Sequence, residues 1–416
     1  MTDTADVGSI VSAAESIQPW VVDIRRRIHR RPEIGLDLPE TQRLVADELE
    51  QLALVPLLGR ELSSVTAFID GGSPGPTVLL RGDMDALPVQ EATDLDFASE
   101  IEGAMHACGH DTHVAMLLGA ARLLVERRSS LAGRVLLMFQ PGEEGRHGAR
   151  HMLDEGLLDV PTDGGFGPVT AAFAQHISAR FNTGTINLRA GAQYAASDSW
   201  TILVHGAGGH ASSPHLALDP IPIAAEIVLA LQTIRSRRIN TFDPMVLTVA
   251  SIAAGTTTNV IPEAALLRGT LRTTSEDVRV EVRKLIERTA TGIAAAHGAK
   301  ADFSMPGGYP PTINDETVAA QVFEVARELF GEERVHDMPN PSMGGEDFSY
   351  VAQKVPATMA FLGATPAGLD PETVPQTHSN KVNLDESAMP TGVALYAAMA
   401  ERLLNRRQVQ GRTMPR

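Results

Sequence analysis

The sequence predicts an α/β protein with two domains: a larger domain with a mixed, mostly parallel sheet and helices on both faces, and an inserted α+β unit of the ferredoxin-like type. Three observations predict this fold class. Short apolar runs alternate with helix patterns up to about residue 192, a different order of elements follows, and the first pattern resumes after Pro310. We therefore place the larger domain at residues 1–192 and 308–416, and the inserted unit at residues 193–307.

The larger domain is predicted from continuous apolar runs, which indicate buried strands, and from apolar residues that recur at helical spacing. Strands that are apolar throughout and alternate with helices are typical of a parallel sheet covered on both faces. Pro32 is expected to end the first helix. The expected strands are Thr77–Leu80, Arg134–Phe139 and Ala171–His176, and the expected helices are residues 15–31, Leu38–Leu54, His113–Glu126, Gly148–Gly156, Thr317–Phe330 and Ser387–Leu404.

The inserted unit is predicted from a different succession of elements. A strand, a helix, two strands, a helix and a final strand form the β-α-β-β-α-β order of a small ferredoxin-like fold. The expected strands are Trp200–Val204, Val246–Ser251, Ala264–Leu271 and Ala301–Ser304, and the expected helices are Pro220–Arg235 and Asp277–Ala295.

Composition excludes several classes of protein. The formal net charge of −16 argues against a nucleic-acid-binding protein, which would carry a basic stripe. No apolar run approaches the roughly 18 residues of a membrane span. A single cysteine cannot form a disulfide within the chain, so nothing in the sequence points to an oxidising compartment. We expect a cytoplasmic protein that binds neither nucleic acid nor membrane.

The most informative feature is a turn that contains the only cysteine. Cys108 lies two residues before His110 in a stretch rich in Gly, His and Asp, and the adjacent pair Glu143 and Glu144 follows the next predicted strand. Thiolate, imidazole and carboxylate groups are ligands for zinc and similar divalent metals. A second glutamate beside a ligand is what a metal-assisted hydrolase needs to move a proton.

Five residues are candidate metal ligands, because they lie at strand ends or in turns, where α/β proteins build their sites. Each has a simpler explanation when taken alone: a small buried cysteine, a structural histidine or a solvated glutamate pair. Together they favour a metal site. The five are Cys108, His110, Glu144, His176 and His378.

Three further groups leave alternatives open. The carboxylates of Asp83 and Asp85 could face solvent in a turn, or could fix the tautomer of a histidine ligand. The basic cluster from Arg25 to Arg31 is expected to form a solvated helix face. Of the remaining histidines, His113 is the best candidate for a role.

At this point the chain resembles a known family, the M20 metallopeptidases, in the amidohydrolase branch that includes N-acyl-amino-acid, hippurate and auxin-conjugate hydrolases. The matching stretches run in order along almost the whole chain. They are Arg26-Arg-Ile-His-Arg-Arg-Pro-Glu33, Arg81-Gly-Asp-Met-Asp-Ala-Leu-Pro88, Met105–His113, Phe139-Gln-Pro-Gly-Glu-Glu144, Gly206-Ala-Gly-Gly-His-Ala-Ser-Ser-Pro-His215, Asn259-Val-Ile-Pro262 and Met343-Gly-Gly-Glu-Asp-Phe348.

The resemblance implies two divalent metal ions per subunit, with zinc, manganese, cobalt and nickel all compatible with the five ligands. It implies that Cys108 bridges or nearly bridges the ions, and that Glu143 is the general base and later the general acid. It also implies that the inserted unit is a lid and dimer contact. Its His210 would stabilise the oxyanion in the partner's site, while Asn259 would help hold substrate and Arg272 would bind its carboxylate. The glycines before His210 are expected to permit tight turns.

The expected function is therefore hydrolysis of the amide bond in a small N-acyl amino acid by a homodimer or a dimer-based oligomer. Two alternatives stay open. One is a dipeptidase or deacetylase of the same family, and the other is a non-catalytic binding protein on the same fold.

Overall fold

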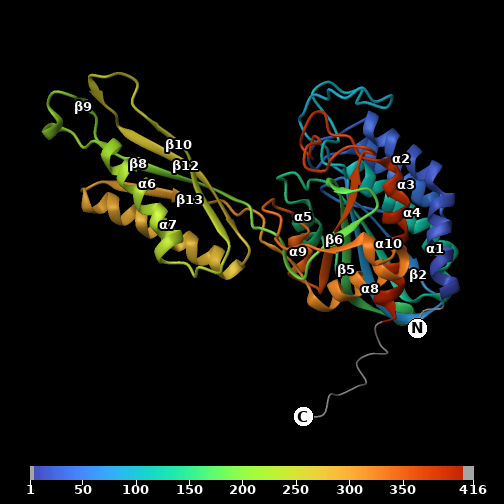
Figure 1. Ribbon diagram of the computed structural model, residues 1–416. Helices are drawn as coiled ribbons and strands as arrows, with labels where there is room; N and C mark the ends of the chain where they lie inside the picture. Colours follow the sequence, from blue (N-terminus) through green and yellow to red (C-terminus); the bar gives the residue numbers. More distant parts are fainter. Residues whose placement is uncertain (1–3, 406–416) are drawn as a thin grey trace, which may run out of the picture. The chain divides into compact units, whose positions relative to one another are not determined.

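The computed structural model describes residues 4–405 (Figure 1), so residues 1–3 and 406–416 of the predicted larger domain lie outside the described part. The chain divides into two compact units. The large unit comprises Met1–Gly191, Ile313–Asn340 and Tyr350–Arg416, and the small unit comprises Ala192–Thr312 and Pro341–Ser349. The sequence did not predict that residues 341–349 belong to the small unit. They do so because Ser342 exchanges backbone hydrogen bonds with Gln193 and Ala195.

The large unit is built on one eight-stranded sheet with the order β1-β2-β4-β3-β5-β16-β6-β15. The central pairs β4–β3, β3–β5 and β5–β16 are parallel, whereas β1–β2, β2–β4 and β16–β6 are antiparallel. Every residue of β16 is buried, as expected for a strand covered on both faces. The strands are β1 (Leu57–Leu58), β2 (Val65–Asp70), β3 (Ser73–Asp83), β4 (Ala132–Gln140), β5 (Phe166–Asn182), β6 (Ile186–Leu188), β15 (Val335–Asp337) and β16 (Ala357–Thr365).

The helices that support the site pack on this sheet and on one another. Helices α4 and α10 contact each other and strands β3 and β5, and α2 packs on α4 (Figure 1). Because α4 is buried along almost its whole length, its first residue, His110, has a rigid support. The helices are α1 (Thr4–Ser16), α2 (Gln18–Arg30), α3 (Pro39–Gln51), α4 (His110–Glu126), α5 (Gly148–Asp154), α8 (Glu316–Phe330), α9 (Ser349–Ala352) and α10 (Met389–Leu404), with 3₁₀ turns η1 (Arg128–Ser130), η2 (Asp163–Gly165), η4 (Glu332–Arg334) and η5 (Glu386–Ala388).

The first predicted helix was wrong in two respects. Residues 15–31 belong to two helices, α1 and α2, and the second starts at Gln18 with Pro19 in its first turn, where proline is favoured because it has no N–H to donate. The basic cluster is not a solvated face throughout. Arg25 and His29 are each only 2% exposed, because acidic side chains from distant parts of the chain pair with them.

The small unit has the predicted β-α-β-β-α-β order. Its four-stranded sheet is antiparallel, with the order β10-β12-β8-β13, and α6 and α7 pack on it around Trp200 and Leu231. The elements are β8 (Asp198–His205), β9 (Gly209–His210), η3 (Pro214–Leu216), α6 (Pro220–Arg237), β10 (Met245–Ala254), β11 (Val260–Ile261), β12 (Ala264–Thr273), α7 (Glu276–Ala296) and β13 (Lys300–Ser304). Two further strands, β7 (Gly191–Tyr194) and β14 (Thr312–Asn314), form a separate two-stranded sheet.

Among residues 4–405, no helix is both long enough and apolar enough to cross a membrane.

The core of the small unit depends on a glycine in β12. A Cβ at Gly269 would lie 2.1 Å from the indole of Trp200 and 2.1 Å from the carbonyl oxygen of Thr248. We predict that Gly269→Ala lowers the free energy of unfolding by about 1–3 kcal/mol, because the buried indole has no room to move. The control is Gly292→Ala in α7, where a Cβ meets no atom within 4 Å and should stabilise the helix by about 0.5–1 kcal/mol. Denaturant unfolding measures both, and equal stabilities would contradict the packing argument.

Candidate metal centre

The turn before α4 brings Cys108 and His110 together. Gly109 between them has a left-handed backbone with φ of 89°, and a Cβ there would lie 2.6 Å from the Cγ2 atom of Ile177. Only glycine satisfies both the conformation and the space. Consequently the cysteine lies beside the first residue of a buried helix, with its side chain 7% exposed.

The other predicted ligands come from three different segments of the large unit. Glu144 lies in the turn that follows β4. The sequence predicted His176 at the end of its strand, but it lies inside β5, because the pairing of β5 with β16 continues beyond it. His378 is in a loop, where its left-handed φ of 71° is uncommon for a residue other than glycine. Its N–H donates to the carbonyl of Ala107, 2.8 Å away, which joins this loop to the cysteine turn.

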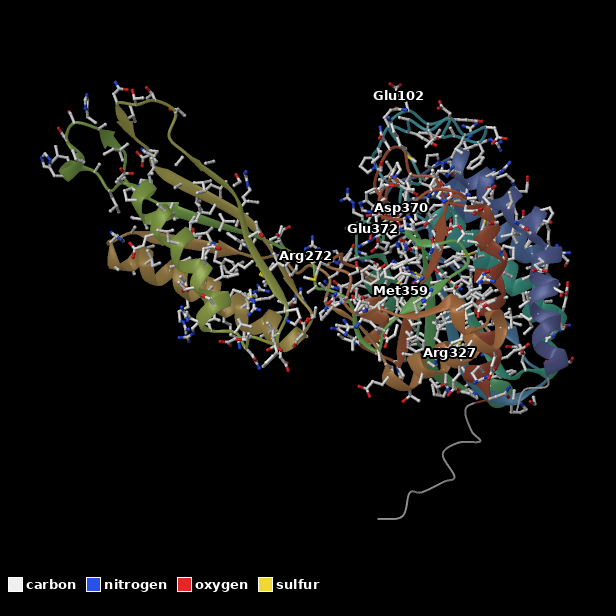
Figure 2. The ribbon with its side chains drawn as sticks, viewed as in Figure 1. Glu102, Arg272, Arg327, Met359, Asp370 and Glu372 are labelled. Atoms are coloured by element: carbon white, nitrogen blue, oxygen red, sulfur yellow. The ribbon has the colours of Figure 1, made fainter. Side chains whose placement is uncertain are left out.

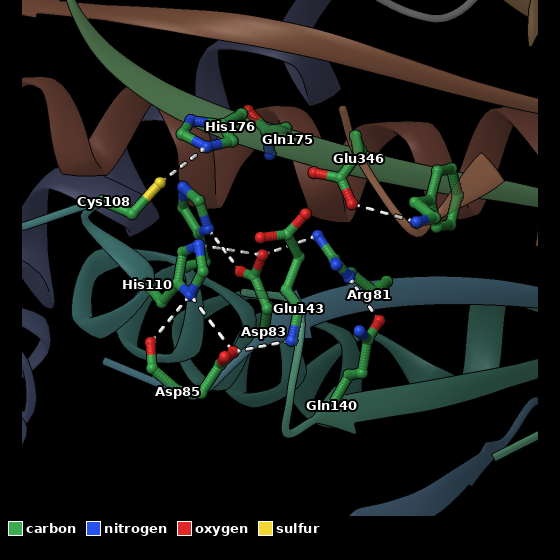
Figure 3. Close-up of polar contacts among 12 residues, drawn as sticks. Arg81, Asp83, Asp85, Cys108, His110, Gln140, Glu143, Gln175, His176 and Glu346 are labelled. Carbon is green, nitrogen blue, oxygen red and sulfur yellow. Dashed lines mark hydrogen bonds and ion pairs between the residues drawn. The ribbon is translucent and has the colours of Figure 1, made fainter. Parts of the chain in front are cut away.

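The structure brings all five predicted ligands together in two groups that share one residue. Cys108, His110 and His176 form one group, and Cys108, Glu144 and His378 form the other. In each group the candidate ligand atoms lie within 4.8 Å of one another. Cys108 Sγ lies 3.4 Å from His176 Nε2, as drawn in Figure 3, and His378 Nε2 lies 3.1 Å from Glu144 Oε1.

The donor atoms fit a divalent metal. His110 Nδ1 donates to the carbonyl of Asp85 at 2.8 Å, and His176 Nδ1 donates to the carbonyl of Ile177 at 2.6 Å, so in both rings Nε2 is the atom available for a metal. His110 Nε2 is buried and makes no hydrogen bond within the described part of the chain, although Asp83 Oδ2 lies 3.3 Å from it. Buried polar atoms in that state are costly unless something satisfies them, and a cation would do so.

Electrostatics within the centre also favour a cation. Burial raises the pKa of the Cys108 thiol, and the charge of Glu144 raises it further. Hydrogen bonds with Cys108 and Glu144 raise the pKa of His378 to about 10. The metal-free centre therefore holds protons on groups that bind metals only after losing them, so metal binding must release protons.

Asp85 settles one of the questions that the sequence left open. It is buried, and its carboxylate accepts from the backbone N–H of Glu143 at 2.9 Å (Figure 3) and from that of Glu144 at 3.0 Å. Its carbonyl also holds His110, as described above. Asp85 therefore fixes the glutamate turn and a histidine tautomer at once.

Asp83 and His113 form a second support. The sequence left Asp83 open between a solvated turn and the fixing of a histidine, and gave His113 as the best candidate among the remaining histidines. His113 Nδ1 lies 2.5 Å from Asp83 Oδ1, and its Nε2 accepts from the backbone N–H of Ile177 at 2.8 Å. Burial lowers the pKa of His113, so the ring is neutral, as this acceptor role requires. Burial opposes the charge on Asp83. The charges of Arg81, His110 and His113 outweigh this effect and lower the pKa of Asp83 well below its usual value. The histidine at the end of the Met105–His113 stretch was the available signal.

In the small unit the structure brings together two of the three predicted residues. His210 and Asn259 line one hollow of about 390 Å³, and His210 pairs with Val260 across the β9–β11 ladder. His210 Nδ1 accepts from the N–H of Ser212 at 3.1 Å, which leaves Nε2 as the donor in the neutral ring. Arg272, labelled in Figure 2, lies instead on β12 opposite Val246 and does not line this hollow.

The glycines before His210 do not serve the predicted purpose. Neither Gly206 nor Gly208 has a positive φ, so neither is there to allow a left-handed turn. Gly206 is needed because the backbones pack closely there: a Cβ would lie 2.4 Å from the carbonyl oxygen of Leu218. At Gly208 the space is tight but less restrictive, with a Cβ 2.9 Å from the Glu263 carboxylate and 3.1 Å from the carbonyl oxygen of Ile261.

Comparisons with known proteins define the class of the molecule as a hydrolase that acts on amide bonds. The model of peptidase family M20/M25/M40 matches residues 79–402, and the chain belongs to this family. A solved Bacillus subtilis structure, the YXEP protein, is described as a dinuclear metal-binding peptidase of the M20 family. It superposes with a TM-score of 0.80 at 33% identity, covering 94% of this chain and 99% of that chain. The ligand groups and this relative support a site for divalent metals.

Three curated relatives are similar over almost their whole length. Thermostable carboxypeptidase 1 of Saccharolobus solfataricus is 37% identical, with 96% of this chain and 99% of that protein covered. The IAA-amino acid hydrolase ILR1-like 2 of Arabidopsis thaliana is 38% identical, with 94% and 87% covered. N-acetylcysteine deacetylase of Bacillus subtilis is 36% identical, with 93% and 98% covered.

The shared cysteine gives a prediction about metal content. We expect His176→Ala and His378→Ala each to bind one ion fewer than the wild type. Cys108→Ala should weaken the binding of both ions, because only Cys108 belongs to both groups. Metal-depleted protein is reconstituted with Zn²⁺, dialysed and assayed by elemental analysis. His215→Ala is the control, because this exposed histidine belongs to neither group. Full metal content in Cys108→Ala would rule out the shared ligand.

Proposed function

We propose that the protein is a metal-dependent amidohydrolase that cleaves the amide bond of N-acyl amino acids. The observation that carries the proposal is the pair of ligand groups joined at Cys108, with Glu143 held beside them by Asp85. Two relatives named for such reactions, an auxin-conjugate hydrolase and an N-acetylcysteine deacetylase, support this substrate class.

In this proposal the five predicted ligands hold two divalent ions, and zinc, manganese, cobalt and nickel all suit the mixed sulfur, nitrogen and oxygen donors. Cys108 would be a ligand of both ions, with His110 and His176 as further ligands of one ion and Glu144 and His378 as further ligands of the other. Bound ions would lower the pKa of a coordinated water toward about 7 and polarise the substrate carbonyl.

Glu143 performs the proton transfers. Its side chain is buried, and its oxygens lie in one group with donor atoms of His110 and Glu144. From this position Glu143 takes the proton of the attacking water and then delivers it to the leaving nitrogen.

We propose that the small unit supplies groups that bind the reacting amide and the carboxylate of the substrate. We propose that the Nε2–H of His210 donates to the oxyanion, because its Nδ1 is already occupied as an acceptor from Ser212. Asn259, in the same hollow, would hold the substrate amide. Arg272 would pair with the substrate carboxylate, since its half-buried guanidinium keeps a positive charge for an anionic partner.

A second candidate function is cleavage of peptides. The similarity to thermostable carboxypeptidase 1 favours it, because a peptide bond at a carboxyl terminus is also an amide of an amino acid with a free carboxylate. A dipeptidase or a deacetylase would use the same groups. A non-catalytic binding protein is not supported, because the relatives named above are hydrolases.

We also propose that the protein is a homodimer through the small unit. Strand β10 is the terminal strand of its sheet, and such an edge readily pairs with a second copy. Apolar side chains are exposed nearby on β10 and on α6: Ile252 is 57% exposed, Leu229 is 72% exposed and Ile221 is 45% exposed. A second copy of the chain would cover this surface.

The function is tested by product analysis with the wild type and Glu143→Gln. We expect the wild type, loaded with each candidate metal, to hydrolyse N-acetyl amino acids and benzoyl-glycine faster than dipeptides. Glu143→Gln should keep its metal but turn over about 10²–10⁴-fold more slowly, because it cannot accept a proton. Glu144→Gln is the matched control and should lose metal. Near-normal turnover in Glu143→Gln would contradict the role of Glu143 in proton transfer. Cleavage of dipeptides alone would favour the second candidate function.

The dimer proposal predicts complementation between inactive variants. If His210 acts in the partner's site, mixed dimers of His210→Ala and Glu143→Gln contain one intact site. Random pairing then restores up to about a quarter of wild-type activity. Mixing Glu144→Gln with Glu143→Gln is the control, because both changes affect the same half of the site and no intact site can form. Equal activity in the two mixtures would show that His210 does not act across subunits.

A further inference from the structure

The stretch Arg26-Arg-Ile-His-Arg-Arg-Pro-Glu33 has no role in the proposed reaction, yet part of it is deeply buried. Arg25, just before the stretch, and His29 within it face a long irregular segment, residues 88–104, which we call the 88–104 loop. A pair of backbone hydrogen bonds between Leu87 and Met105 closes this loop at its base.

His29 lies between two carboxylates from opposite directions. Its Nδ1 is 2.8 Å from Asp111 Oδ2, and its Nε2 is 3.3 Å from Glu91 Oε1. Burial alone would lower the pKa of His29, but the charge and hydrogen bond of Asp111, with the hydrogen bond to Glu91, raise it to about 9. Both ring nitrogens can therefore donate, so the one side chain joins α4 to the 88–104 loop.

Glu91 in turn holds the loop in its shape. Beyond its contact with His29, it accepts from the backbone N–H of Ser99 at 2.7 Å and from the hydroxyl of Thr93. These three donors come from α2 and from two places in the loop. The loop therefore closes around one carboxylate.

Phe97 makes a second attachment between the loop and α2. Its ring is 4% exposed and lies against the guanidinium groups of Arg25 and Arg26, with carbon-to-centroid distances of 5.2 Å and 4.6 Å. It also meets the ring of His29 edge to face at 5.3 Å. Such contacts add to the burial of an aromatic side chain.

The loop is bonded to the segment that carries His378. The N–H of Ala92, next to Glu91, donates to the carbonyl of Asn380 at 2.8 Å. His378 lies two residues away in a left-handed conformation, which persists only where its surroundings fix it. Asp111, the other partner of His29, directly follows His110 in the sequence.

We propose that His29 and Glu91 are positioning residues that set the place of the His378 segment, residues 376–382, relative to the start of α4. They act through the 88–104 loop and the Ala92–Asn380 hydrogen bond, and neither touches a metal or substrate. The proposal rests on the proposed function in one respect, that His378 binds a metal. Groups that orient a ligand typically change metal affinity about 10–100-fold when they are removed.

The experiment uses variants in the loop, because a change at buried His29 could prevent folding. Glu91→Ala removes all three contacts, Glu91→Gln keeps acceptors without the charge, and Glu102→Ala is the control. Glu102 lies in the same loop with an exposed side chain (Figure 2), so its loss removes the same charge without these contacts. Hydrogen exchange on the full-length metal-free protein reports the mobility of each segment, and Zn²⁺ titration against a chromophoric chelator reports the two affinities.

We expect Glu91→Ala to speed amide exchange in residues 376–382 as well as in the 88–104 loop, and to weaken one of the two Zn²⁺ affinities about tenfold or more. Glu91→Gln should fall between Glu91→Ala and the wild type, and Glu102→Ala should match the wild type. Faster exchange confined to the 88–104 loop, with both affinities unchanged, would overturn the proposal. Neither readout requires turnover, so a failure of the proposed substrate class would not change the interpretation of this result.

Discussion

Three segments that are far apart in the chain meet at Asp85. Its carbonyl oxygen accepts from His110 at the start of α4, and its two carboxylate oxygens accept from the consecutive N–H groups of Glu143 and Glu144 after β4. A buried carboxylate is costly unless such donors satisfy it, so the same contacts that stabilise Asp85 also fix the orientation of the glutamate turn. Glu143 and Glu144 depend on this one residue for their position, although it belongs to neither group of candidate ligands.

Around this point the site consists of charges that are buried in pairs. Arg81 lies beside Asp83, and Arg25 beside Asp111, all with almost no exposed surface. Removing such charges from water offsets much of their attraction, so pairs of this kind contribute little to net stability. Their effect is on geometry, since each carboxylate also holds a histidine: His113 by Asp83 and His29 by Asp111. The orientation of these two imidazoles, which belong to neither ligand group, therefore follows from ion pairs formed by residues of β3, α2 and α4.

The sequence predicted the part of this arrangement that depends on local pattern. Cys108 and Glu144 were recognisable because ligand-type residues stand in turns beside apolar strands, and the central strands of a parallel sheet bring such turns to one edge. The position of His176 inside β5 was missed, because the strand continues only through its pairing with β16. The burial of Arg25 and His29 was also missed. A run of basic residues looks solvated unless its acidic partners are known, and here Asp111 is more than eighty positions away. His210 and Asn259 were predicted only from the resemblance to a family, because no local spacing could connect them to the ligands, and their roles stay predictions.

The shared position of Cys108 gives the centre a chemical weakness. Oxidation of one thiol to a sulfenic or sulfinic acid would alter a donor that belongs to both ligand groups at once. In many proteins a neighbouring cysteine captures a sulfenic acid as a reversible disulfide, but this chain has no second cysteine to do so. Protection must therefore come from burial of the sulfur and from a metal bound to it. Thiols from outside the chain can reduce a sulfenic acid at Cys108 but not a sulfinic acid. The residue that unites the two halves of the site is thus also the one whose loss to an oxidant the molecule cannot reverse by itself.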